Sequence, residues 1–228
     1  MKKFIETISN IWKIDELRQR IILTLGLLLV YRFGAQIVLP GIDTAQLAQL
    51  SSNTENGILG ILNAFTGGAF ANASVFALGI MPYISASIVV QLMGIAIPYL
   101  QKLQKEGESG RKTINQITRW LTIGICIVQA PAYLYGLGAL GVPDSAFVLG
   151  KGLDFIGPAV IILVTGCVFA MWLGEKITDK GIGNGISLLI MVGIIATLPQ
   201  AFAQEFVSRT ANNTGGIMFM LIEVIVWF

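Results

Sequence analysis

Several stretches of 18 or more consecutive residues in this chain contain no charged side chain. An uncharged apolar stretch of that length is typical of a membrane-spanning helix, because ~20 residues rising ~1.5 Å each cross the ~30 Å hydrocarbon core. Charged residues make up only 12% of the 228 residues, about half the fraction of an ordinary soluble domain. We therefore expect an all-α membrane protein.

The predicted architecture is a polytopic bundle of membrane helices. Residues 1–20 place apolar and basic side chains on different faces, which is typical of an interfacial helix on the cytoplasmic surface. The apolar segment 215–228 is expected to be part of a sixth helix that runs off the end of the chain. The expected full spans are 21–39, 75–97, 120–140, 155–173 and 186–203.

The segment 57–74 does not fit the pattern of the spans. It is only mildly apolar, because 8 of its 18 residues are Gly, Asn, Thr or Ser. These residue types weaken a helix and make lipid exposure costly. Its composition leaves two interpretations, a poor additional span or a re-entrant element that protein shields from lipid.

The basic residues choose between these interpretations, because cytoplasmic loops are enriched in Lys and Arg. If 57–74 does not cross the membrane, the loops carry twelve basic residues inside and two outside; if it crosses, each side carries seven. We therefore expect 57–74 to enter and leave on the outer side. Irregular backbone at membrane depth requires surrounding protein or a water-filled cavity, which indicates a channel or a transporter.

The chain contains no histidine, which excludes imidazole metal sites and Ser-His-Asp triads. We expect no metal, no cofactor and no enzymatic activity, and we expect Cys126 and Cys167 to be buried small apolar side chains. The run 107–110 (GESG) resembles an intramembrane protease motif, but no base accompanies its serine, so we interpret it as a chance match. The run 181–185 (GIGNG) lacks the context of a phosphate loop, and we expect a flexible start to the next span.

Five side chains within the spans are each open to two interpretations. Arg32 is the only basic residue inside a span, and snorkelling to the surface and a functional site are equally compatible with its position. Gln91 and Gln129 are uncharged polar groups whose default role is hydrogen bonding between helices. Ile84 and Ile88 share a helix face, which suits simple packing or an apolar pore constriction.

Longer motifs add a resemblance to a known family. The chain resembles the SecY family, the channel subunits of the bacterial protein translocon, from about residue 15 to about residue 200. The motifs that carry this resemblance are Pro40–Asp43 (PGID), Leu78–Ile88 (LGIMPYISASI), Lys105–Arg111 (KEGESGR), Met171–Glu175 (MWLGE) and Gly181–Ser187 (GIGNGIS).

The resemblance implies the first half of a SecY-type fold, with helices 1–5, the start of helix 6 and a re-entrant plug at 57–74. It also implies a protein-conducting channel that translocates unfolded secretory chains and inserts membrane proteins. The implied pore ring comprises Ile84, Ile88 and Ile190. The implied lateral gate comprises Ser85, Ser87, Gln91 and Gln129.

The resemblance assigns two further sets of residues. The implied plug residues are Gly57, Leu59, Asn63, Thr66, Gly67, Gly68 and Asn72. The residues of a cytoplasmic loop that contributes to partner docking are Lys102, Lys105, Arg111 and Lys112.

The implied partners are the SecE and SecG subunits, SecA or the ribosome, signal sequences, nascent polypeptides and membrane lipid, with ribosomal RNA as the one nucleic acid in reach. The implied location is the bacterial cytoplasmic (inner) membrane, with the amino terminus in the cytoplasm. The competing hypothesis is a secondary transporter whose broken helix binds a small solute. A transporter site needs polar groups at the midplane, and the three ring isoleucines supply none.

Overall fold

The computed structural model describes residues 13–43, 63–139, 146–147, 150 and 152–211. Most of the predicted interfacial helix 1–20, the plug residues Gly57 and Leu59, and the segment 215–228 lie outside these residues. Within the described part the regular structure is helical, and the two β-bridges are isolated pairs. The helices are α2 (Asp15–Gln36), α5 (Met81–Ala96), α6 (Pro98–Lys105), α7 (Glu108–Ala139), α8 (Leu153–Lys180) and α9 (Gly185–Ala211).

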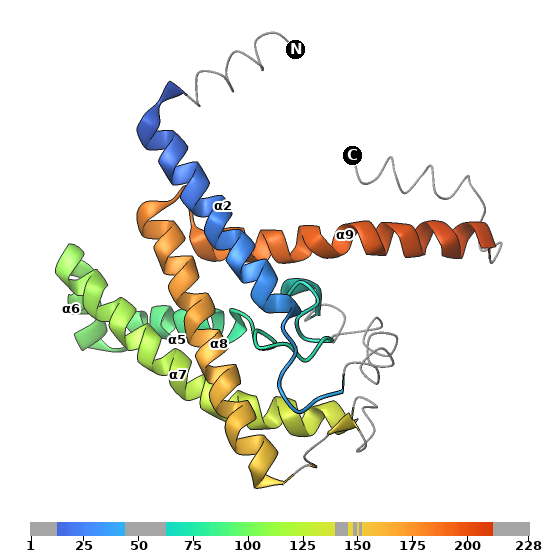
Figure 1. Cartoon of the computed structure of the whole chain (residues 1–228). Coiled ribbons are helices and arrows are strands. Elements are labelled where there is room, and N and C mark those ends of the chain that lie inside the picture. Colours follow the sequence, from blue (N-terminus) through green and yellow to red (C-terminus); the bar gives the residue numbers. More distant parts are fainter. Residues whose placement is uncertain (1–12, 44–62, 140–145, 148–149, 151, 212–228) are drawn as a thin grey trace.

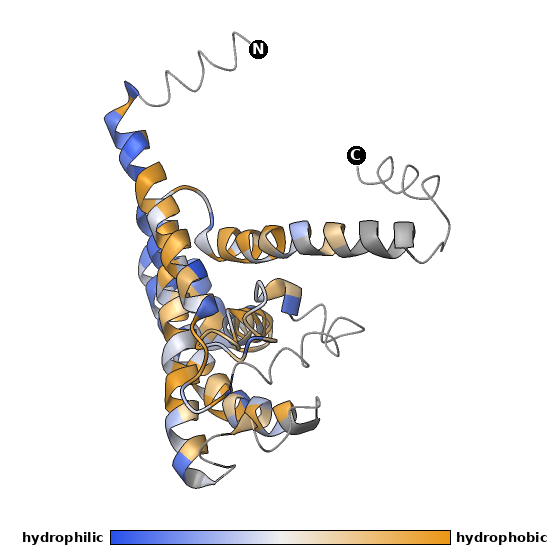
Figure 2. Cartoon of the chain, turned by 45° about the vertical axis from the view of Figure 1, so that its right-hand side comes forward, coloured by the Kyte–Doolittle hydropathy of each residue, from blue (hydrophilic) through white to orange (hydrophobic). Residues whose placement is uncertain are grey.

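The helix α8 is the centre of the bundle. It packs against α2, α7 and α9, and α5 packs against α7. Figures 1 and 2 show α9 leaving this bundle sideways, so that its outer half projects away from the other helices. Figure 2 also shows hydrophilic residues at the start of α2 and apolar residues along the middle of the helices.

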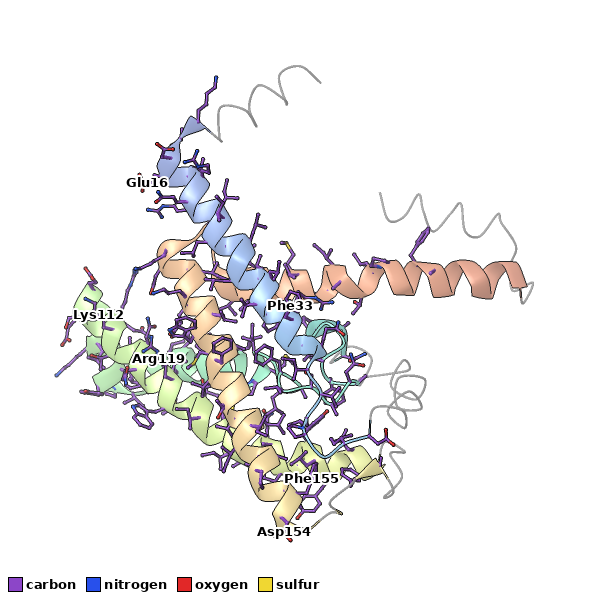
Figure 3. All side chains as sticks on the ribbon, viewed as in Figure 1. Glu16, Phe33, Lys112, Arg119, Asp154 and Phe155 are labelled. Atoms are coloured by element: carbon purple, nitrogen blue, oxygen red, sulfur yellow. The ribbon has the colours of Figure 1, made fainter. Side chains whose placement is uncertain are left out.

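Among the residues that the structure describes, three helical segments are long and apolar enough to cross a membrane: Glu108–Leu137, Asp154–Lys180 and Gly185–Ala203. The pair α5 and α6 makes a fourth candidate if its two helices count as one span. The helix α2 contains the predicted first span as far as Gln36. Figure 3 places Glu16 of α2 and Asp154 of α8 at opposite ends of the bundle, as charged residues flanking an apolar middle.

The helix α5 is shorter than the predicted span 75–97. Residues 75–80 form turns, and the helix begins only at Met81, with Pro82 in its first turn where a missing N–H costs nothing. At Ile97 the chain bends by 101° into α6. The side chain of Gln101 donates a hydrogen bond to the Ile95 carbonyl oxygen across this bend, with a nitrogen–oxygen distance of 2.6 Å.

The glycines of the two polar turns have packing roles. A Cβ at Gly110, in the first turn of α7, would lie 1.7 Å from the Leu103 carbonyl oxygen, so the glycine lets the start of α7 pack closely against the end of α6. A Cβ at Gly185 would lie 2.0 Å from the Gly174 carbonyl oxygen. The backbone at Gly185 thus packs closely against α8 where α9 begins, while residues 182–184 of the turn are exposed, and the expected flexibility of this start stays a prediction.

The core lies mainly along α8. One cluster joins α7 and α8 around Leu137 and Leu163, and a second joins α2, α8 and α9 around Tyr31 and Leu173. Cys126 and Cys167 are buried, as expected, with their sulfur atoms 2.8 Å apart between α7 and α8.

Candidate functional site

The candidate site is the non-helical segment 63–80, called the hairpin below. Apart from one helical turn at 63–65, it consists of successive turns between α2 and α5. Its backbone enters the left-handed region at Gly67 (φ 64°) and Gly68 (φ 88°), which favours glycine at both positions. Ala73 adopts the same region at φ 44° without being a glycine, which is an uncommon and strained conformation.

The polar side chains of the hairpin satisfy its own backbone. The Asn63 side-chain oxygen accepts a hydrogen bond from the Ala71 N–H at 2.9 Å. The Thr66 hydroxyl donates to the Asn63 carbonyl oxygen at 3.1 Å and accepts from the Phe70 N–H at 3.1 Å. These bonds explain why a polar segment tolerates burial, since the groups that would otherwise need water are paired internally.

Two long side chains bind the hairpin from outside it. Arg32 of α2 donates from Nη1 to the Gly67 carbonyl oxygen at 2.9 Å. Tyr133 of α7 donates from its hydroxyl to the Phe70 carbonyl oxygen at 2.8 Å. The sequence left Arg32 open between snorkelling and a site, and the structure directs it inward onto the hairpin.

Glycines on two helices let the hairpin backbone approach closely. A Cβ at Gly193 of α9 would lie 2.8 Å from the Phe65 carbonyl oxygen. A Cβ at Gly166 of α8 would lie 2.2 Å from the Val75 carbonyl oxygen. Such approaches require glycine, because the nearest atoms belong to backbone that cannot move aside.

The base of the hairpin is tied to the chain that follows α2. The Leu39 N–H donates to the Ala73 carbonyl oxygen and the Val75 N–H donates to the Ile37 carbonyl oxygen, both at 2.9 Å. The Phe76 ring stacks on Tyr31 of α2, with ring centroids 5.5 Å apart. The hairpin is therefore held by α2, α7, α8 and α9 together.

The predicted plug residues within the described part gather in this hairpin. Thr66 and Gly67 are buried, and Asn63 and Gly68 are partly buried. Asn72 is exposed. Sequence reasoning missed Tyr133, Gly166 and Gly193 because nothing distinguishes a tyrosine or glycine that binds a re-entrant segment from one that packs against a neighbouring helix.

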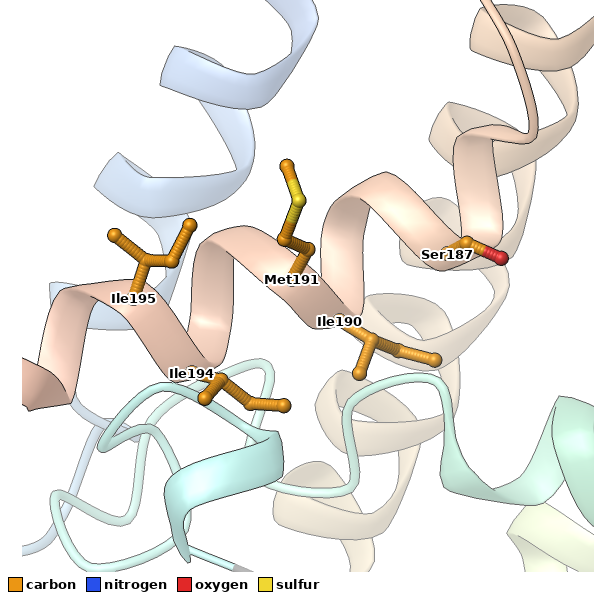
Figure 4. Close-up of a pocket in the computed structure, with 5 residues that line it drawn as sticks. All are labelled: Ser187, Ile190, Met191, Ile194 and Ile195. Carbon is orange, nitrogen blue, oxygen red and sulfur yellow. The ribbon is translucent and has the colours of Figure 1, made fainter. Parts of the chain in front are cut away.

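The predicted ring residues lie on two helices. Ile84 of α5 is partly buried against the α2–α8 cluster, whereas Ile88 is 52% exposed. Ile190 of α9 is partly buried and lines an open hollow of about 350 Å³ (Figure 4). The residues that line this hollow are Ser187, Ile190, Met191, Ile194 and Ile195.

The predicted gate residues are on the outside of α5 and α7. Ser85, Gln91 and Gln129 are exposed, and Ser87 is partly buried. The Gln91 side chain donates to the Ser87 hydroxyl at 3.2 Å within α5. These residues thus present polar groups on an apolar surface without bonding between the two helices in the described part.

The basic loop residues surround the turn from α6 to α7. Lys102, Lys105, Arg111 and Lys112 are all exposed, and Lys112 pairs with Glu108 at 3.2 Å. Figure 3 shows Lys112 near the start of α7 and Arg119 further along the same helix. Within the residues described, no group of three or more carboxylates and thiols is placed to hold a metal ion.

A family model described as SecY matches residues 74–228 of the sequence. The chain belongs to the SecY family. A SecY relative from Escherichia coli (strain K12), named protein translocase subunit SecY, is 44% identical over 215 residues, which cover 94% of this chain and 48% of the relative. The same-named SecY protein of Pseudomonas aeruginosa is 49% identical over 197 residues, covering 86% of this chain and 43% of the relative.

Two solved structures share this SecY fold. They are described as Sec61 in the canine ribosome–channel complex from the endoplasmic reticulum and as the structure of a protein-conducting channel. Each matches with a TM-score of 0.53 and 19% identity, covering 91% of this chain and 41% of the solved one. The chain is therefore a multi-pass membrane protein that spans about half the length of the SecY relatives it matches.

Proposed function

We propose that this chain forms part of a protein-conducting channel, which translocates unfolded secretory polypeptides and inserts membrane proteins. The observation that carries the proposal is the hairpin at 63–80, an irregular segment that four membrane helices hold inside a helical bundle. Irregular backbone at membrane depth is tolerated where it is buried in protein or lines a cavity. In a channel the hairpin residues that fall within 57–74 are part of the plug that closes the outer side of the pore.

The isoleucines Ile84, Ile88 and Ile190 form part of the pore ring in this proposal. Ile88 is exposed and Ile190 borders an open apolar hollow, so both have room to meet a passing chain. Branched aliphatic side chains close around varied polypeptides and offer no hydrogen bonds that would trap them. An apolar constriction also blocks ions by excluding water.

The exposed polar groups of α5 and α7 form one side of a lateral gate. Ser85, Ser87 and Gln91 lie on α5, and Gln129 lies on α7. Signal sequences contact this surface on their way into lipid. Polar groups at this surface lower the free energy needed to open the gate, because they hydrogen-bond to one another or to the backbone of a passing chain.

The assembly partners and location complete the proposal. We assign the protein to the bacterial inner membrane with its amino terminus in the cytoplasm, together with SecE and SecG. No covalent bond is made or broken by the chain, and SecA or the ribosome supplies the driving force. The exposed basic residues Lys102, Lys105, Arg111 and Lys112 contribute to docking these partners, with ribosomal RNA as a contact for their charges.

Cross-linking tests this proposal directly. A stalled secretory chain that carries one cysteine is presented to the assembled channel with a cysteine in place of Ile84, an oxidant is added, and disulfide adducts are measured. We expect a strong adduct at position 84 and none at Tyr135, a matched exposed position on α7. Adducts at position 135 with none at position 84 would contradict the pore assignment.

A further inference from the structure

We propose that Arg32 and Tyr133 are positioning residues that hold the tip of the hairpin (residues 63–71) in its closed position, as a latch does, while the base at 73–75 remains attached and acts as a hinge. This inference rests on the proposed function of the hairpin as a plug. It assigns the two side chains that set how readily the plug leaves its closed position.

The position of Arg32 supports a latch. A guanidinium within a membrane span is costly, and such charges are kept where they serve a site. The Nη1 of Arg32 donates to the Gly67 carbonyl oxygen at 2.9 Å. A Cβ at Gly67 would lie 2.5 Å from that same nitrogen, so the glycine is needed for the contact.

Tyr133 binds the tip from a different helix. Its hydroxyl donates to the Phe70 carbonyl oxygen at 2.8 Å, and its ring meets the Phe70 ring edge-on with centroids 5.0 Å apart. Tyr133 is 7% exposed, so losing this partner would leave a buried hydroxyl unpaired. Arg32 of α2 and Tyr133 of α7 thus donate hydrogen bonds to two carbonyl oxygens that are three residues apart in the hairpin.

The side-chain hydrogen bonds of Asn63 and Thr66 lie within the tip of the hairpin and survive a movement of the tip as one piece. Two backbone bonds join the tip to the base: the Ala73 N–H donates to the Phe70 carbonyl oxygen at 3.3 Å and the Ser74 N–H to the Ala69 carbonyl oxygen at 3.0 Å. The base is joined to the chain after α2 by two backbone bonds at Ala73 and Val75. Ala73, with its positive φ, is the first residue of the base, where a change of backbone conformation relieves strain.

Release of the tip therefore breaks the hydrogen bonds of Arg32 and Tyr133, the backbone bond from Ser74 to Ala69, and the packing of the fully buried Ala69 in the α2–α8–α9 cluster. It also ends the close approach of Gly193 on α9 to the Phe65 carbonyl oxygen and to Gly67, the residue that Arg32 binds. Any movement of α9 away from α2 acts on the same point as Arg32. A polypeptide that displaces α9 from within would unlatch the tip without unfolding the hairpin.

The test measures the position of the tip in the assembled channel. Spin labels are placed on cysteines at Phe65, which is 37% exposed, and at Ile161 of α8, which is 67% exposed. Pulsed electron resonance then gives the distribution of label distances. The buried Cys126 and Cys167 are checked for labelling in the protein without introduced cysteines.

Four variants separate a latch from general packing. Arg32→Met removes the donor and should raise the displaced population about tenfold, as expected for the loss of a charge-assisted hydrogen bond. Arg32→Lys keeps a donor and should restore most of the closed population. Tyr133→Phe should raise the displaced population about threefold. Arg20→Met, which removes an exposed α2 arginine paired with Glu16, is the matched control and should change nothing.

A distance distribution in Arg32→Met that equals that of Arg20→Met would overturn the latch. If Arg32→Met does not assemble, Tyr133→Phe decides, with Tyr135→Phe as its exposed control on α7. Equal distributions in those two variants would also overturn it. Ion conductance is recorded in parallel: a displaced tip without increased conductance supports the latch and contradicts the proposed plug function, so the two failures are distinguishable.

Discussion

The hairpin at 63–80 and the helix α9 differ in how closely each packs against the rest of the protein, and the order is the opposite of what their hydropathy suggests. The hairpin is irregular and rich in Gly, Asn, Thr and Ser, yet it is bound by four helices. The segment Gly185–Ala203 is strongly apolar, yet only 12% of it is buried within the protein, against 39% for the corresponding part of α8. The more polar segment is thus the more integrated one.

This difference separates two kinds of membrane solvation. An apolar helix satisfies its backbone internally and can face lipid or another protein surface along its length. Irregular backbone has no such freedom, so it must find partners for its carbonyls and fit closely against glycines. We infer that the hairpin tolerates few substitutions and that α9 tolerates many.

The largest expected effect compares two phenylalanines. Phe76 of the hairpin is 5% exposed and stacks on two aromatic rings, whereas Phe202 of α9 is 57% exposed. Phe76→Ala should lower the free energy of unfolding by about 4 kcal/mol, because it leaves a cavity. Phe202→Ala should lower it by less than about 1 kcal/mol. Equal losses, measured by denaturation in detergent, would remove the contrast.

A second comparison concerns two helical glycines. Gly166→Ala should destabilise the protein by about 2 to 3 kcal/mol, because the new Cβ meets the Val75 carbonyl oxygen at 2.2 Å. Gly124→Ala on α7 meets nothing within 4 Å and should stabilise its helix by up to about 1 kcal/mol. A lower unfolding temperature for Gly166→Ala with a higher one for Gly124→Ala would confirm that α8 lies too close to the hairpin backbone to accommodate a Cβ. A loss at position 124 as large as that at 166 would contradict it.

A third comparison stays within the hairpin. Asn63→Ala removes the acceptor of the Ala71 N–H, which belongs to a residue only 3% exposed, and should cost about 2 kcal/mol. Asn72→Ala removes an exposed side chain and should change the unfolding free energy by less than about 0.5 kcal/mol. Both are measured by the same chemical denaturation. An equally large loss in Asn72→Ala would show that polarity itself, rather than internal bonding, stabilises the segment.

The smallest expected effect is at the proposed gate. Gln91→Ala breaks an exposed hydrogen bond to Ser87 of 3.2 Å and should alter stability by less than about 0.5 kcal/mol. Insertion of a signal sequence into lipid, followed by cross-linking, should nevertheless slow measurably. A variant with unchanged insertion would count against Gln91 as a gate residue.

The sequence predicted the class of this fold because length and charge alone identify membrane helices. Uncharged runs indicated α7, α8 and α9, and the basic-residue count led us to expect that 57–74 does not cross. The sequence did not predict where α5 begins, because residues 75–80 are as apolar as a helix and only the turn at Gly79 interrupts them.

The anchors of the hairpin were beyond prediction from sequence for a physical reason. Tyr133 and Phe70 are 63 residues apart in the sequence, and their contact depends on how the hairpin packs against α7. Gly193 lies in an apolar run where a glycine usually serves helix packing. Among these anchors, only Arg32 stood out in the sequence, because it is a charged residue inside a span. The sequence did not indicate that it binds the Gly67 carbonyl oxygen.

Thiol labelling from each side of the membrane tests the central claim, that the hairpin is open to the outer side while the α6–α7 turn lies in the cytoplasm. Single cysteines replace the exposed residues Asn72 and Lys105, and an impermeant reagent is added to right-side-out or inverted vesicles. We predict that position 72 reacts only in right-side-out vesicles and position 105 only in inverted ones. Reaction of both positions from the same side would contradict the account.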